Sequence, residues 1–113
     1  MIERDGEHAV YIRLRLSDDD FGARAERIAL MQLEQDVERA LAHSSVGQFD
    51  GNEVGGGWHT LVCYGDDADA VYAAIEPIVV SYGARPGSQV VKQYGEPGPS
   101  TTVRTVDLAG DGD

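Results

Sequence analysis

The residues with the clearest chemical potential stand near the middle of the chain, in the run Asp50-Gly51-Asn52-Glu53. Two carboxylates and an amide beside a flexible glycine can hold a cation or exchange protons with a bound molecule. Hairpin bends prefer the same residue types, because Gly tolerates positive φ and Asp and Asn bond to nearby backbone. We favour a bend, and keep as the alternative a small-molecule or metal-binding protein or an enzyme that uses this hairpin. In that alternative Asp50 and Glu53 line a cleft together with Trp58 and His59.

The other reactive side chains do not combine into a catalytic or metal-binding set. His59 and Cys63 share one face of a predicted strand, but they stand roughly 13 Å apart, too far to chelate one ion or to form a nucleophile–base pair. The glycines of residues 55–57 lack the Lys and Ser or Thr of a phosphate-binding loop. The acidic residues 18–20 lack the spacing of a calcium loop and are interpreted as a helix cap. We therefore nominate no catalytic residue, no metal and no cofactor, and expect a protein that is not an enzyme.

Local periodicity predicts the elements that must position these residues. Apolar side chains recur at helical spacing over residues 22–43 and again over residues 68–79, with Pro77 expected to kink or shorten the second helix. Ile28 and Met31 widen the apolar surface of the first helix, so we expect it to contact something besides its own sheet. Alternating apolar and polar residues predict strands at 9–16, from 46 onward, at 58–64 and at 88–94.

The order strand, helix, strand, strand, helix, strand is that of a ferredoxin-like βαββαβ sandwich, an α+β fold. Right-handed crossovers place both helices on one face of a four-stranded antiparallel sheet. We expect a flexible N-terminus (1–8), one domain over residues 9–95, and a C-terminal extension (96–113) that is partly disordered. Residues 101–106 are rich in β-branched side chains and are a candidate for an extra C-terminal edge strand.

The sheet face without helices is expected to carry aromatic and basic side chains. Alternation places Leu61 and Cys63 inward in the third strand, and we place Val91 inward and Val90 outward in the fourth. The candidate interaction surface is then Tyr11, Arg13, Arg15, Trp58, Tyr64, Lys92 and Tyr94. A dimer or partner interface is the favoured role of such a surface. Coverage by the C-terminal segment and stacking of single-stranded RNA bases are the alternatives.

The formal net charge is −11, from 20 Asp and Glu against nine Lys and Arg. This charge repels phosphate backbones and anionic lipids, which argues against nucleic acid and membranes as partners, and it favours encounters with basic proteins. The N-terminus does not read as a signal peptide, and no apolar run approaches the ~20 residues that cross a bilayer. With a single cysteine, these features predict a cytoplasmic protein.

The segment Val46-Gly47-Gln48-Phe49-Asp50-Gly51 follows a helix, leads into a strand, and resembles the ribonuclease E inhibitor B domain (regulator of ribonuclease activity B). That family has a Gly-Gly-x-Tyr-Asp-Gly-Trp-like segment in a ferredoxin-like fold. The resemblance covers about residues 25–65 and rests on Gly47, Phe49, Asp50 and Gly51, with Val46 at the first glycine and Asn52 at the tryptophan. It implies an acidic regulator that docks on another protein. The runs 50–57 and 64–69 also resemble small uncharacterised bacterial ferredoxin-like proteins, which imply no activity.

We therefore expect a small acidic cytoplasmic protein that acts as a non-enzymatic regulator or inhibitor through protein–protein contact. Either it forms a homodimer through the open sheet face or it blocks a basic partner. The acidic residues of the first helix, Glu34, Asp36 and Glu38, and the aromatic sheet face motivate this expectation.

Overall fold

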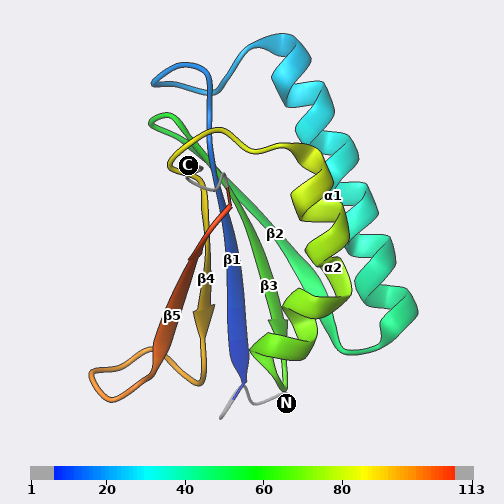
Figure 1. Ribbon diagram of the computed structural model, residues 1–113, viewed down its shortest axis with the longest axis vertical. Coiled ribbons are helices and arrows are strands. Elements are labelled where there is room, and N and C mark those ends of the chain that lie inside the picture. Colours follow the sequence, from blue (N-terminus) through cyan, green and yellow to red (C-terminus); the bar gives the residue numbers. More distant parts are fainter. Residues whose placement is uncertain (1–6, 109–113) are drawn as a thin grey trace.

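The computed structural model describes residues 7–108, which form an α+β arrangement with two helices on one face of a five-stranded antiparallel sheet (Figure 1). In chain order the elements are β1 (His8–Arg15), α1 (Arg24–Ser44), β2 (Gly47–Gly55), β3 (Trp58–Gly65), α2 (Ala68–Tyr82), β4 (Gln89–Gln93) and β5 (Val103–Asp107). The strand order is β2-β3-β1-β4-β5. This arrangement is compatible with the predicted βαββαβ order, to which residues 103–107 add a fifth strand at the edge of the sheet. Of the segments predicted to be flexible or disordered, residues 1–6 and 109–113 lie outside the described residues.

The core lies between the sheet and the two helices, as the periodicity predicts. Val10, Ile12 and Leu14 of β1 are at most 1% exposed, and α1 buries Leu30, Leu33, Val37 and Leu41 along one stripe. The bounds of α1 fall within two residues of the predicted 22–43. Apolar burial on the helix side of the sheet therefore specifies which face of each element points inward.

Two expectations about the helices are wrong, the second of them in part. The acidic run does not cap α1, because Asp18 accepts hydrogen bonds from the backbone N–H groups of Asp20 and Gly22 in the preceding turn. Pro77 does not shorten α2, which continues to Tyr82, while the alternative expectation that it kinks the helix stays a prediction. Val79, fully buried beyond the proline, gives a packing reason for the helix to continue. The Asp67 carboxylate caps α2, since it accepts from the backbone N–H of Asp69 in the first turn.

The faces of β4 are the reverse of those predicted. Val90 pairs with Ile12 and is fully buried, whereas Val91 pairs with Tyr11 and lies on the face without helices. Two adjacent valines fit either alternation, so the local pattern cannot choose between the two faces.

This reversal places Lys92 and Tyr94 on the helix side of the sheet, and their assignment to the open face is wrong. Lys92 Nζ and the Tyr94 hydroxyl both donate to the Asp69 carboxylate in the first turn of α2, at 3.1 and 2.6 Å. The Lys92 ammonium also lies 5.3 Å from the centre of the Tyr72 ring. Both residues therefore tie the end of β4 to α2 and are unavailable to the opposite face.

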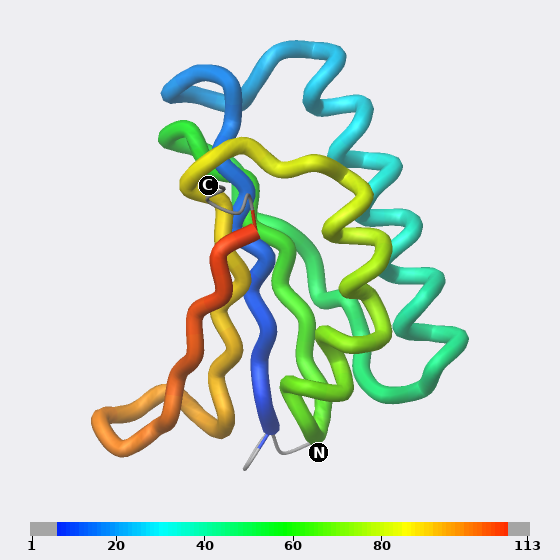
Figure 2. The backbone as a smooth tube through the Cα atoms, viewed as in Figure 1, coloured from blue at the N-terminus to red at the C-terminus, as the bar shows by residue number. Residues whose placement is uncertain are grey.

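Three loops gather at one end of the sheet (Figure 2), namely the β1–α1 loop, the β2–β3 turn and the α2–β4 loop. The turn is Gly56-Gly57, with φ of +62° and +90°, so both positions need residues that tolerate positive φ. Gly57 accepts from the backbone N–H of Leu16 at 2.8 Å and donates to the carbonyl of Asp20 at 2.9 Å. The hairpin is thereby fastened to the loop that precedes α1.

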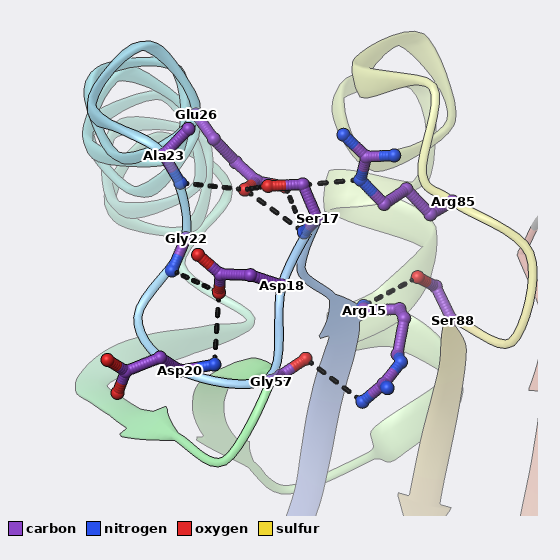
Figure 3. A network of polar contacts seen from close by, with 10 residues as sticks. All are labelled: Arg15, Ser17, Asp18, Asp20, Gly22, Ala23, Glu26, Gly57, Arg85 and Ser88. Carbon is purple, nitrogen blue, oxygen red and sulfur yellow. Dashed lines mark hydrogen bonds and ion pairs between the residues drawn. The ribbon is translucent and has the colours of Figure 1, made fainter.

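Glu26 joins two of these loops through its carboxylate (Figure 3). It accepts from the Ser17 hydroxyl at 2.7 Å, from the Ala23 backbone N–H at 3.3 Å and from Arg85 Nε at 3.2 Å. Burial by itself would raise the pKa of Glu26, but the hydrogen bonds from Ser17, Arg85 and Ala23 outweigh it and hold the pKa below its ordinary value. The carboxylate thus stabilises the fold in its charged form.

Glu26→Gln is expected to make the free energy of unfolding depend less strongly on pH in the acidic range. Because the folded-state pKa lies below the unfolded-state value near 4.5, the carboxylate contributes stability above that value and loses it as the pH falls through the folded-state pKa. Urea unfolding at about pH 7 and about pH 3 should show a difference between wild type and Glu26→Gln that shrinks on acidification. Glu76→Gln, an exposed change on α2, is the control. Parallel loss of stability in wild type and Glu26→Gln would contradict the assignment.

Candidate functional site

The candidate site is the sheet face opposite the helices, and the pairing of β1 with β3 builds its centre. The register places Tyr11 opposite Val62, Arg13 opposite Thr60 and Arg15 opposite Trp58. Directly paired residues of an antiparallel sheet project to the same face, so these side chains are neighbours. All six are partly exposed, whereas the residues that alternate with them are buried.

Two arginines stack on a single tryptophan at this centre. The guanidinium carbon of Arg13 lies 4.4 Å from the centre of the Trp58 ring, and that of Arg15 lies 5.1 Å away. Arg13 also donates to Gln89 Oε1 at 3.1 Å, and Arg15 forms an ion pair with Asp19 at 3.2 Å. Cation–π contact and these bonds hold both guanidinium groups in place before any ligand arrives.

The stack borders a concavity of about 590 Å³, which is lined by Tyr11, Arg13, Glu53, Val54, Gly55, Trp58, Thr60, Val91 and Gln93. Burial raises the pKa of Tyr11, and the neighbouring Tyr64 and Glu53 raise it further, so the phenol keeps its proton at neutral pH. The concavity therefore offers hydrogen-bond donors from Arg13 and Tyr11 beside aromatic and aliphatic surface.

The structure brings together four of the seven residues predicted for the interaction surface, Tyr11, Arg13, Arg15 and Trp58. Tyr64 shares their face farther along β3, opposite Ala9, while Lys92 and Tyr94 lie on the helix side. Sequence reasoning missed Val91 and Gln93 as lining residues, and it assigned Glu53 with Trp58 to the alternative hairpin cleft rather than to this face. The opposite alternation along β4 would have assigned Val91 and Gln93 to the open face.

The hairpin run 50–53 forms a bulge rather than one pocket. The β2–β3 register shifts between Phe49 and Gly51, which leaves Asp50 as the extra residue. The Asn52 amide donates to Glu34 of α1 at 2.5 Å, on the helix side. Glu53 instead pairs with Thr60 and borders the concavity on the open face. The predicted bend is therefore present, and the candidate site residues of the run are divided between two faces of the sheet.

His59 likewise points away from Trp58. Its Nε2 lies 2.6 Å from Glu34 Oε2, and the residue as a whole is only 7% exposed, so the cleft predicted between Trp58 and His59 is not formed. Cys63 is buried too, and burial raises the pKa of its thiol to about 12. Within residues 7–108, no group of three or more His, Cys, Asp or Glu side chains is placed to hold a metal ion.

In the described part of the chain, neither α1 nor α2 combines the length and apolar character that a membrane-spanning helix needs. No protein-family model matches the chain, and it has no significant match among curated proteins or solved structures. The resemblance of residues 25–65 to the ribonuclease E inhibitor B domain therefore stays a prediction.

Proposed function

We propose that this chain is a non-enzymatic, cytoplasmic protein-binding regulator with a ferredoxin-like fold, whose open sheet face docks a segment of a partner protein. The observation that carries the proposal is the placement of Arg13 and Arg15 over Trp58 at the centre of that face. Tryptophan, tyrosine and arginine are the residue types that dominate binding energy at protein interfaces. Their fixed geometry reduces the conformational entropy that a partner must offset on binding.

The chemistry of the face indicates what the docked segment presents. A guanidinium carries five N–H donors, and Arg13 uses one of them in its hydrogen bond to Gln89. The remaining donors allow a partner carboxylate to accept two hydrogen bonds from the same guanidinium. Apolar side chains of the segment would pack on Tyr11 and Val91 in the concavity. The net charge of −11 over the whole chain favours encounter with a protein that is basic overall. We therefore propose a basic partner that docks through a carboxylate-bearing segment.

Peptide display against the purified wild-type chain tests the proposal. Enriched peptides are expected to carry Asp or Glu beside an apolar or aromatic residue. Their affinity should fall about tenfold or more for Arg13→Gln and Trp58→Ala, a loss of about 1.4 kcal/mol per factor of ten. Arg104→Gln, an exposed arginine on β5, should leave affinity unchanged.

Two results would reject this function. One is a failure to enrich any peptide whose binding depends on Trp58, with the fold of each variant checked by circular dichroism. The other is tighter binding of single-stranded oligonucleotides than of peptides by the same face, which would assign it to base stacking.

The alternative, a small-molecule or metal site or an active site on the Asp50–Glu53 hairpin, has less support. Asn52 turns to Glu34 on the helix side, while Glu53 borders the opposite face. A ligand held by all four residues would have to contact both sides of the sheet.

A further inference from the structure

Helix α1 carries a second stripe of regularly spaced residues on a side that does not enter the core. The stripe consists of Arg24, Ile28, Met31, Gln35, Glu38 and Ala42, and all six are exposed. Their spacing alternates between four and three residues, which is the spacing of the contact positions in a helix that packs against another helix. Ile28 and Met31 are 55% and 57% exposed, although both are large apolar side chains.

The other elements in residues 7–108 leave this stripe accessible. The side of α1 nearest α2 is marked by Ala29 and Leu33, which line a groove with Ile78 and Tyr82. Met31 lies on another side, where it borders a small groove beside β2. In Figure 1 α1 is the outer of the two helices, with α2 between it and the central strands. The stripe therefore occupies a side of the molecule that a second chain can reach.

The charges of the stripe indicate which kind of helix can pack against it. Arg24 and Glu38 each stand seven residues from Met31, which is about 10 Å along the axis and nearly the same angular position. If a second α1 packs antiparallel about a two-fold axis at Met31, Arg24 of each copy faces Glu38 of the other. The two Met31 side chains then meet at the axis, and Ile28 of each copy lies about one turn away, beside Gln35 of the other copy. A parallel pairing would instead bring Arg24 against Arg24.

We propose that this side of α1 is a homodimer interface, formed by two antiparallel copies of the helix around a two-fold axis at Met31. The interface is isologous, because the same stripe serves both copies. It lies on the helix layer, so it leaves the open sheet face of each copy free. The proposal does not depend on what the open face binds.

Charge reversal tests the pairing by sedimentation equilibrium. Arg24→Glu and Glu38→Arg each place like charges opposite one another, so each is expected to weaken dimerisation about tenfold or more at low salt. The double variant Arg24→Glu/Glu38→Arg restores both ion pairs with their signs exchanged, and its dissociation constant should return to within about threefold of wild type. If the double variant loses as much dimerisation free energy as the two single variants together, the proposed pairing is wrong. A wild type that stays monomeric at about 1 mM would overturn the interface itself.

Cross-linking provides a second readout that does not depend on salt. Met31→Cys places two thiols at the proposed axis, and mild oxidation should give a covalent dimer. Val80→Cys on α2 is the matched control, because Val80 is 58% exposed and lies outside the stripe. Native Cys63 is buried and does not compete for the oxidant. Equal cross-linking of the two variants would show random collision and reject the proposal.

Discussion

Gly65→Ala is expected to lower the free energy of unfolding by about 3 kcal/mol, the cost of overpacking a well-packed site. Gly65 pairs with Gly47 across β2 and β3, directly under α2. A Cβ at Gly65 would lie 2.5 Å from Val71 Cγ2 and 2.5 Å from the Val46 carbonyl oxygen, of which the second is backbone and cannot rotate away. A Cβ at Gly47 would meet the Tyr64 carbonyl in the same way. The glycine pair is therefore what lets α2 approach the sheet.

Urea unfolding followed by circular dichroism measures the effect. Gly98→Ala is the matched control, since a Cβ there meets nothing closer than the Thr101 hydroxyl at 3.8 Å. The control should change stability by no more than about 0.5 kcal/mol. If Gly65→Ala unfolds at the same urea concentration as wild type, the close approach of α2 to these strands is wrong. The same pair gives Gly47, one of the residues that carry the resemblance to the inhibitor domain, a packing role independent of any partner.

Glu34→Ala is expected to cost about 2 kcal/mol, because it leaves two polar groups without their acceptor. Glu34 Oε2 lies 2.6 Å from His59 Nε2 and 2.5 Å from Asn52 Nδ2, and the side chains of Glu34 and His59 are only 16% and 9% exposed. Removing the carboxylate leaves a buried imidazole on β3 without its partner. It also removes the hydrogen bond that joins Asn52 of β2 to α1.

The conservative change Glu34→Gln separates hydrogen bonding from charge in this cluster. A glutamine carbonyl still accepts from the imidazole or from the Asn52 amide, so less than half of the loss is expected. The joint replacement Glu34→Leu/His59→Phe removes both partners and should be closer to wild type than Glu34→Ala. Equal stability of Glu34→Ala and wild type in thermal and urea unfolding would mean that the contact does not hold α1 to the sheet.

The two proposed surfaces lie on different layers of the molecule, and this has a consequence for binding. A dimer formed through α1 would carry two open sheet faces. A partner with two carboxylate-bearing segments could then engage both, and the second contact would be intramolecular, which raises the apparent affinity without new contacts. Disruption of the α1 pairing by Met31→Glu should reduce binding of a bivalent peptide and leave that of a monovalent peptide unchanged.

Much of the fold follows from local patterns in the chain. Alternation in β1 predicts that Val10, Ile12 and Leu14 are buried, and helical spacing predicts the buried stripe of α1, because both periods depend only on backbone geometry. The same local rule places Arg13, Arg15 and Trp58 on one face of the sheet. Helical spacing also sets the apolar residues Ile28 and Met31 apart from the buried stripe of α1.

Other features are decided only when distant segments pack together. The face of β4 depends on whether Val90 or Val91 pairs with Ile12, and identical neighbours carry no local signal for that choice. His59 finds Glu34 on a helix 25 residues earlier in the chain, so its role cannot be inferred from β3 by itself. The stacking of two arginines on Trp58 likewise requires the β1–β3 register. Sequence periodicity thus determines which side of each element is apolar, while the pairing between elements determines which polar groups meet, because that depends on contacts between residues far apart in the chain.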